Sequence, residues 1–245
     1  MMYDYDEELL KGFEERISAV RENIGAAARE ASRDVSDITL IGVSKVFPVS
    51  YAEAAFSAGL KDLGENRVQE LVPKYDRMKE LGMEPNWHLI GTLQTNKVKY
   101  IIGRTCLIHS VDSVKLMAEI GKRSEASGLV SDVLIEVNVS GEETKHGFSP
   151  VMLRESIDQI NGLSGVRVRG LMTMAPIEQY EGQARKVFHD ARELFTDMKG
   201  YVKEPGCWDT LSMGMSHDYI DAIKEGATHI RIGTAIFGDR NSVKP

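Results

Sequence analysis

The sequence has little of several features that mark specialised classes of protein. Its 245 residues include two cysteines, Cys106 and Cys207, with neither a CxxC pair nor a histidine-rich segment beside them. Two cysteines cannot build the disulfide framework of a small secreted protein, and their spacing does not fit a zinc site. We therefore expect both thiols to be reduced, in or near the core of a cytoplasmic protein that holds no metal.

Long apolar runs and clusters of basic residues are also absent from the sequence. No stretch approaches the roughly 20 apolar residues of a membrane span, and the acidic N-terminal segment MMYDYDEELLKGF does not resemble a signal peptide. The net charge of −7, without a run of Lys and Arg, argues against nucleic-acid binding. No tract rich in Pro, Gly or Ser divides the chain, so we expect residues 1–245 to form one soluble domain.

A helical period marks the N-terminal segment. Apolar side chains recur there at steps of three and four residues, which places on one helix face Leu10, Phe13, Ile17, Val20, Ile24 and Ala27. Acidic residues crowd the start of this segment, where the positive end of a helix dipole favours them. Because the helix precedes the first predicted strand, we expect residues 1–35 to pack against the outside of the fold.

Beyond this helix, short apolar runs alternate with segments of helical spacing. The runs predict strands at 38–43, 61–66, 86–91, 106–111, 132–139, 166–172, 209–214 and 229–233. The clearest helical segments cover residues 50–59, 67–81, 113–127 and 183–199. Strands separated by helices imply right-handed crossovers and a parallel sheet, and eight such units predict a (β/α)₈ barrel of the TIM type. An open, doubly wound sheet is disfavoured because no Gly-rich nucleotide fingerprint follows the first strand.

Polar residues recur where the predicted strands end, which is the edge at which barrels of this type assemble their sites. They include Lys45, Asn66, His88, His109, Asp112, Asn138, Ser140, the serines of 212–216 and Arg231. Several also have a structural explanation. Asn66 and Asp112 suit caps of the helices that follow them, and His88, beside an apolar Trp, suits a hydrogen-bonded core histidine. The methionines of LMTMAP and LSMGMS suit the packing of irregular gaps.

Two segments near the C-terminus resist a purely structural interpretation. LSMGMSHD (211–218) and RIGTAIFG (231–238) bring glycine and hydroxyl side chains to the ends of the seventh and eighth predicted strands. Loops at these two places in a barrel often bind phosphate, helped by backbone N–H groups at a helix start. We expect a phosphate cradle there, with Ser212, Gly233 and Thr234 as donors. Arg231, on an apolar strand beside it, should meet a planar or acidic group.

Lys45 follows directly on the apolar run LIGVS (40–44). A buried ammonium is costly, so this lysine either reaches solvent at the rim or has a chemical role. Beside a phosphate site, a desolvated lysine suits Schiff-base formation with a phosphorylated carbonyl compound. A sugar phosphate, as in an aldolase, and pyridoxal 5′-phosphate both fit. Arg231 favours the second, because a pyridine nitrogen is commonly partnered by Asp or Arg.

A set of longer motifs runs through nearly the whole chain. They are VSKVFP (43–48), GENRVQE (64–70), WHLIGTLQTNKVK (87–99), HSVDS (109–113), VNVSGEETKHGF (137–148), VRGLMTMAP (168–176), LSMGMSHD (211–218) and HIRIGTAIFG (229–238). On these motifs the chain resembles the YggS/PROSC family of pyridoxal-phosphate-binding proteins, also called pyridoxal phosphate homeostasis proteins. Thr92 and His217 depart from the pattern of that family, which leaves the principal contacts in place.

The resemblance implies a barrel similar to that of bacterial alanine racemase. It implies the cofactor as a Schiff base on Lys45, its phosphate at Ser212, Gly233 and Thr234, and its ring nitrogen facing Arg231. The expected cofactor-binding residues are therefore Lys45, Asn66, Ser212, Met213, Arg231, Gly233 and Thr234, without a catalytic or metal-ligating residue.

These expectations favour a protein that holds pyridoxal 5′-phosphate and supplies it to apo-enzymes. Arg231 would keep the ring nitrogen unprotonated, and the chain ends directly after the barrel, without the second domain and the partner tyrosine of the racemases. A single-domain racemase or decarboxylase with Lys45 as a base is the alternative, and a Schiff-base aldolase without pyridoxal is a third reading. Lys145 and His88 are further candidates for a role in cofactor exchange. A monomer is expected, since a closed barrel needs no partner to bury its sheet.

Overall fold

The computed structural model describes residues 4–141, 146–176, 180 and 182–239. Within them, eight parallel strands pair in sequence order and β8 pairs with β1, which closes a barrel. The strands are β1 (Thr39–Val43), β2 (Asp62–Glu65), β3 (Asn86–Leu89), β4 (Leu107–Val111), β5 (Ser131–Glu136), β6 (Val166–Met172), β7 (Thr210–Ser212) and β8 (His229–Ile232). The predicted (β/α)₈ barrel is confirmed, and each predicted strand overlaps an observed one.

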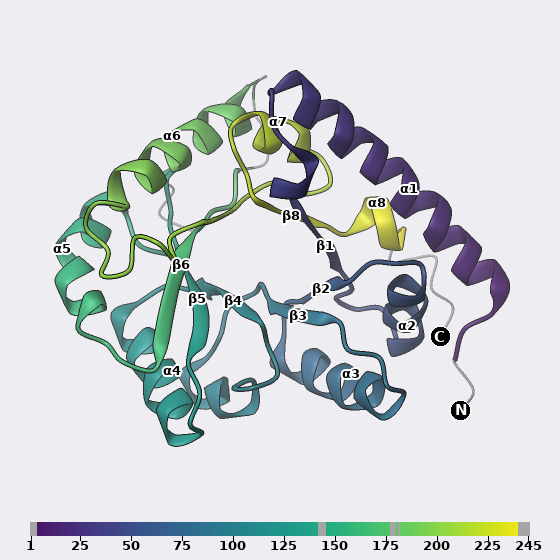
Figure 1. Cartoon of the computed structure of the whole chain (residues 1–245), viewed down its shortest axis with the longest axis horizontal. Helices are drawn as coiled ribbons and strands as arrows, with labels where there is room; N and C mark the ends of the chain where they lie inside the picture. The colour runs from purple at the N-terminus through teal and green to yellow at the C-terminus, as the bar shows by residue number, and fades with distance from the viewer. Residues whose placement is uncertain (1–3, 142–145, 177–179, 181, 240–245) are drawn as a thin grey trace.

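Helices surround the barrel as an outer ring (Figure 1). They are α1 (Glu7–Glu30), α2 (Val49–Ser57), α3 (Val68–Glu80), α4 (Val114–Ala126), α5 (Pro150–Asn161), α6 (Gln183–Met198), α7 (Tyr219–Lys224) and α8 (Thr234–Phe237), with 3₁₀ helices η1 (Val35–Asp37) and η2 (Thr95–Tyr100). The main apolar core lies between the strands and these helices. In the described part of the chain, no helix is both long enough and apolar enough to cross a membrane.

Helix α1 is the additional N-terminal helix that the sequence predicts. Asp6 caps its first turn by accepting a hydrogen bond from the Leu9 N–H at 2.8 Å. Its buried face, which includes Phe13 and Ile17, packs against α2, α7 and α8 on the outside of the barrel. The Arg16 side chain ties the helix to the C-terminal end of the chain by donating to the Ile236 carbonyl.

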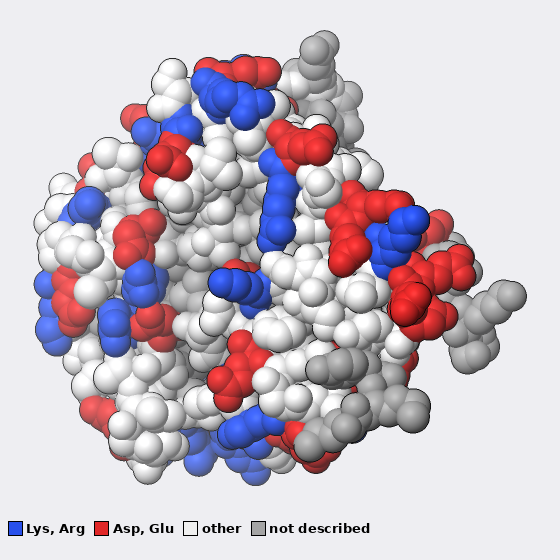
Figure 2. All heavy atoms as spheres, turned by 45° about the vertical axis from the view of Figure 1, so that its right-hand side comes forward, with Lys and Arg blue, Asp and Glu red and all other residues white. Residues whose placement is uncertain are grey.

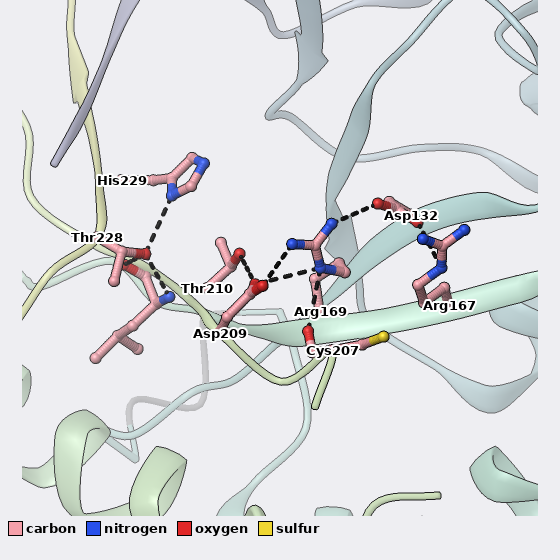
Figure 3. A network of polar contacts seen from close by, with 9 residues as sticks. Asp132, Arg167, Arg169, Cys207, Asp209, Thr210, Thr228 and His229 are labelled. Atoms are coloured by element: carbon pink, nitrogen blue, oxygen red, sulfur yellow. Dashed lines mark hydrogen bonds and ion pairs between the residues drawn. The ribbon is translucent and has the colours of Figure 1, made fainter. Parts of the chain in front are cut away.

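An ion-pair network joins the N-terminal ends of β5, β6 and β7 (Figure 3). Arg169 donates to Asp132 at 2.7 Å and to Asp209 at 2.6 Å. Burial alone would raise the pKa of Asp209, but the hydrogen bonds from Arg169 lower it. In barrels this face serves stability, and ligands bind at the opposite face. The network therefore fastens the end of the barrel remote from the candidate site.

Two details differ from the sequence expectations. Cys106 is exposed rather than in the core, and Cys207 is half-buried; both are unpaired. Ser113, not Asp112, is the N-cap of α4, and it accepts from the Leu116 N–H at 3.3 Å. Asp112 instead accepts a hydrogen bond from the Ser113 hydroxyl. Acidic and basic side chains are interspersed over the face of the described residues that Figure 2 shows.

Candidate functional site

A cavity of about 250 Å³ lies at the C-terminal ends of the strands. Segments following β1, β2, β3, β6, β7 and β8 supply its walls, as expected for a barrel site. The lining residues are Val43, Lys45, Phe47, Asn66, Ile90, Met174, Met215, Ser216, His217, Arg231, Gly233, Thr234 and Gly238. Five of the seven predicted cofactor-binding residues meet here: Lys45, Asn66, Arg231, Gly233 and Thr234.

Lys45 stands half-buried two residues beyond the end of β1. A tight turn holds it there, in which the Phe47 N–H donates to the Ser44 carbonyl at 3.2 Å. Val46 adopts a left-handed backbone with φ of 65°, which is strained for a β-branched residue. Glu70 stabilises the turn by accepting from the Val46 N–H at 2.7 Å. These two hydrogen bonds hold the strained turn and thus fix the chain on either side of Lys45.

A buried ion pair lies directly behind this turn. Lys74 of α3 donates to Glu65 at 2.5 Å and to the Ser44 carbonyl at 2.8 Å, and the Ser44 hydroxyl donates to Glu65 at 2.6 Å. Burial raises the pKa of Glu65, against the effect of its positively charged partner. The pair immobilises the residue that precedes Lys45. Among the described lysines, Lys45 alone belongs to the cavity lining, while Lys74 points into this pair.

Asn66 follows β2 and reaches the cavity from the next position around the barrel. The alternative that it caps α3 is wrong, because the N-cap position is Arg67. Gly91, after β3, lets the two segments approach closely. A Cβ atom at Gly91 would lie 2.5 Å from the Asn66 carbonyl oxygen, so no larger residue fits there without moving the backbone.

Arg231 forms part of the cavity wall although only 4% of its surface is exposed. Its guanidinium donates to the Ser212 hydroxyl at 2.5 Å and to the Thr173 carbonyl at 2.9 Å. Burial lowers the pKa of Arg231 to about 10, while the carboxylates of Asp218 and Glu136 oppose this shift. The side chain therefore keeps its charge at neutral pH and presents a fixed donor to the cavity.

The wall beside Val43, the last residue of β1, combines hydroxyl groups with main chain. Ser216 accepts a hydrogen bond from the Gly233 N–H at 3.2 Å, which joins the loops after β7 and β8. A Cβ atom at Gly233 would meet Val43 alone, at 3.8 Å or more, so the protein itself leaves space at this position. Ser216 and Thr234 offer hydroxyl groups to an anion, and Gly233 lets it approach the main chain without a Cβ atom in the way.

Ser212 and Met213, predicted as cofactor contacts, are completely buried and do not belong to the cavity lining. Ser212 ends β7 and uses its hydroxyl inside the barrel, whereas Ser216 in the following loop faces the cavity. The sequence places Ser216 among the serines after the seventh predicted strand but does not single it out as a phosphate donor, although the rule that loops after strands carry the site favours it.

The remaining candidates lie elsewhere. His217, one of the two departures from the family pattern, is exposed on the cavity rim. His88 is a buried, hydrogen-bonded histidine outside the lining, as its structural explanation predicted. Lys145 lies outside the described residues. In the described part of the chain, no group of His, Cys, Asp or Glu side chains is arranged to hold a metal ion.

Comparison with known proteins shows the family to which this chain belongs. The family model of the alanine racemase N-terminal domain matches residues 16–241. A pyridoxal phosphate homeostasis protein of Aquifex aeolicus is 46% identical over 92% of this chain and 97% of the relative. A protein of the same name from Pseudomonas aeruginosa is 38% identical over 94% of this chain and 97% of its own.

Solved structures show the same fold. PipY of Synechococcus elongatus with PLP bound has a TM-score of 0.80 and 32% identity, over 92% of this chain and all 100% of PipY. An alanine racemase of Clostridium difficile in complex with cycloserine has a TM-score of 0.67 and 16% identity, over 89% of this chain and 59% of the racemase. At that identity the likeness to the racemase concerns the barrel alone.

Proposed function

This chain belongs to the family of pyridoxal phosphate homeostasis proteins, and we propose that it binds pyridoxal 5′-phosphate covalently through Lys45 and supplies it within the cell. The observation that carries the proposal is one cavity lined by a lysine, a buried guanidinium and a wall of hydroxyl groups and glycine main chain. These three groups match the aldehyde, the ring nitrogen and the phosphate of that cofactor. A relative with the cofactor bound, PipY, supports the same assignment.

The residues of the cavity have distinct proposed roles. Lys45 supplies the amine for the Schiff base, and the turn around Val46 holds it beside the cavity. Ser216, Gly233 and Thr234 bind the phosphate, which revises the predicted set by exchanging Ser212 for Ser216. Asn66 contacts the cofactor from the segment after β2. Met213, completely buried in the main apolar core, acts in packing.

Arg231 favours storage over catalysis. Bound pyridoxal phosphate supplies an electron sink for amino-acid chemistry, and its strength depends on a protonated ring nitrogen. Arg231 offers that nitrogen only N–H donors, which leaves it unprotonated. The curated relatives carry the name of homeostasis proteins rather than of enzymes, which supports the same reading. We therefore propose a reservoir without substantial turnover.

The proposal extends to partners and assembly. We propose a monomer, because the closed barrel buries its own sheet without a partner, and we propose that residues 1–245 act as one cofactor-binding domain. The recipients are apo-enzymes that use pyridoxal phosphate, which the protein meets transiently in the cytoplasm where such enzymes are made. Neither nucleic acid nor a membrane has a part in this proposal.

Cofactor transfer and turnover can be measured side by side. The holoprotein is incubated with an apo-enzyme that requires pyridoxal phosphate and, separately, with a panel of L- and D-amino acids. We expect recovery of the apo-enzyme's activity without racemisation or decarboxylation, and no recovery from a Lys45→Ala control. Turnover of an amino acid at about one per second or faster would instead establish the single-domain enzyme.

A further inference from the structure

Polar side chains are hydrogen-bonded across the interior of the barrel. His109 on β4 and Ser212 on β7 lie 2.9 Å apart, from Nδ1 to Oγ, although these strands are not neighbours in the closed barrel. Two inward side chains can meet in this way only through the barrel interior, which is commonly filled by branched apolar residues. Here an apolar cluster of Leu107, Leu134 and Met172 occupies part of the interior, and the polar groups occupy another part.

Further hydrogen-bond contacts extend from this pair in both directions, and together they form one line through Arg231, Ser212, His109, His88 and Asp62. Arg231 Nη1 lies 2.5 Å from Ser212 Oγ, and His109 Nε2 lies 3.0 Å from His88 Nδ1. His88 Nε2 lies 3.1 Å from Asp62 Oδ1. Asp62 is the first residue of β2 and its side chain is 21% exposed, whereas Arg231 lines the cavity. The line therefore connects the cavity with the opposite end of the barrel.

The chemistry of the groups favours one direction of the hydrogen bonds. Arginine cannot accept a hydrogen bond, so Ser212 accepts from Arg231 and has one proton left to donate. Donation of that proton to Nδ1 of His109 places the proton of a neutral His109 on Nε2, which donates to His88. His88 then carries its own proton on Nε2 and donates to the Asp62 carboxylate. Each donor in the line has an acceptor in this arrangement.

A second arrangement reverses part of the line. A doubly protonated His88 would donate to both Asp62 and His109, and His109 would donate to Ser212. The proton of Ser212, a completely buried residue, would then lose its acceptor. A further positive charge would also stand inside a barrel that already contains Arg231. Buried polar groups are costly without partners, so the first arrangement is favoured.

We propose that Ser212, His109, His88 and Asp62 are positioning residues that hold Arg231, through a one-directional hydrogen-bond line, in place for the ring nitrogen of the cofactor. The line is a property of the ligand-free protein; its effect on the cofactor rests on the proposed function. Ser212 and His109 act on the cofactor only through Arg231, because neither belongs to the cavity lining.

His229 provides a matched control inside the same barrel. Its ring centroid lies 6.1 Å from that of His88 and 6.3 Å from that of His109, so it shares their surroundings. Its Nδ1 lies 3.1 Å from the Thr228 hydroxyl, a contact that Figure 3 shows and that stands apart from the line. A His229→Asn variant therefore disturbs the interior without breaking the line.

The first experiment determines the histidine tautomers of the ligand-free protein by long-range ¹H–¹⁵N NMR at neutral pH. We expect His88 and His109 both neutral with the proton on Nε2, and we expect Ser212→Ala to shift the His109 signals while leaving those of His229 in place. A His88 imidazolium, or a proton on Nδ1 of His109, would overturn the proposal. This result does not depend on cofactor binding, so it separates the failure of the line from the failure of the proposed function.

The second experiment compares pyridoxal 5′-phosphate with its 1-deaza analogue, which has a carbon in place of the ring nitrogen. Loss of one charged hydrogen bond from a held Arg231 predicts about tenfold weaker binding of pyridoxal 5′-phosphate to Ser212→Ala and to His109→Ala. Binding of the analogue to both variants, and of both ligands to His229→Asn, should change less than about twofold. Equal losses of affinity for the cofactor and the analogue would show a merely structural role and overturn the proposal. Unchanged affinity for the cofactor in both Ser212→Ala and His109→Ala would overturn it as well.

Discussion

Removal of the Thr234 hydroxyl should weaken the binding of pyridoxal 5′-phosphate without disturbing the barrel. Thr234 is the first residue of α8, is exposed, and lines the cavity. The substitution Thr234→Val preserves the branched shape of the side chain, so the only polar atom lost is Oγ1. The effect on the ligand can therefore be read without a large effect on folding.

The size of the effect follows from the position of the hydroxyl. A hydrogen bond to a charged group contributes about 1.5–3 kcal/mol. Because Thr234 is exposed, water competes for the phosphate, and we expect the lower end of this range. About 1.5 kcal/mol corresponds to a roughly tenfold rise in the dissociation constant. Ser216→Ala should cost a similar amount, since Ser216 stands on the same wall and contacts Gly233.

The assay titrates apo-protein with pyridoxal 5′-phosphate and with unphosphorylated pyridoxal, followed by visible absorbance. Affinity for pyridoxal should stay within about twofold of the unmodified protein, because the lost contact is to the phosphate. Thr196→Val is the matched control, since that hydroxyl bonds the Arg192 carbonyl on α6, away from the cavity. Equal losses for both ligands, or no loss for either, would refute the assignment of the phosphate to this wall.

Two further predictions concern the framework of the site. Lys74→Met leaves Glu65 buried without its cation and should lower the free energy of unfolding, measured in urea, by about 3–5 kcal/mol. The double variant Lys74→Met/Glu65→Gln should recover part of this loss. Unchanged stability of Lys74→Met would contradict the role of the buried pair. Burial lowers the pKa of His229 to about 4, below its ordinary value of 6.5. Between pH 4 and pH 6.5 the unfolded chain therefore binds more protons than the folded protein, and the free energy of unfolding falls as the pH drops from 6.5 towards 4. The loss of unfolding free energy between pH 7.5 and pH 4.5, measured by urea titration, should be smaller by up to about 3 kcal/mol in His229→Gln than in the unmodified protein. The same pH dependence in both proteins would contradict this prediction.

Much of the fold could be predicted because the signals are local. Apolar runs of strand length alternate with helical periods, and the N-terminal helix repeats at three and four residues. The sequence also predicts which residues lie together in the cavity, because the ends of the strands meet at one edge of a barrel. These residues are Lys45, Asn66, Arg231, Gly233 and Thr234. The sequence could not decide whether a serine near the end of β7 faces the interior or the cavity. Ser212 is the last residue of the strand and is buried, whereas Ser216 lies four residues further on, in the loop that lines the cavity.

Contacts between distant segments could not be predicted in the same way. The pair of Glu65 and Lys74 depends on which face of β2 meets α3, and a one-residue change of register would turn Glu65 to the other side. The line from Arg231 to Asp62 joins side chains from five strands, and a single sequence carries no signal of which inward positions meet across a barrel.

The covalent role of Lys45 is the central claim, and reduction of the holoprotein with borohydride tests it most directly. Reduction converts a Schiff base into a stable amine, and peptide mass mapping then identifies the modified lysine. We predict a phosphopyridoxyl group on the peptide containing Lys45, and its loss from a Lys45→Arg variant that retains the fold. The same group found on another lysine, such as Lys74 or Lys145, with the Lys45 peptide unmodified, would contradict the account.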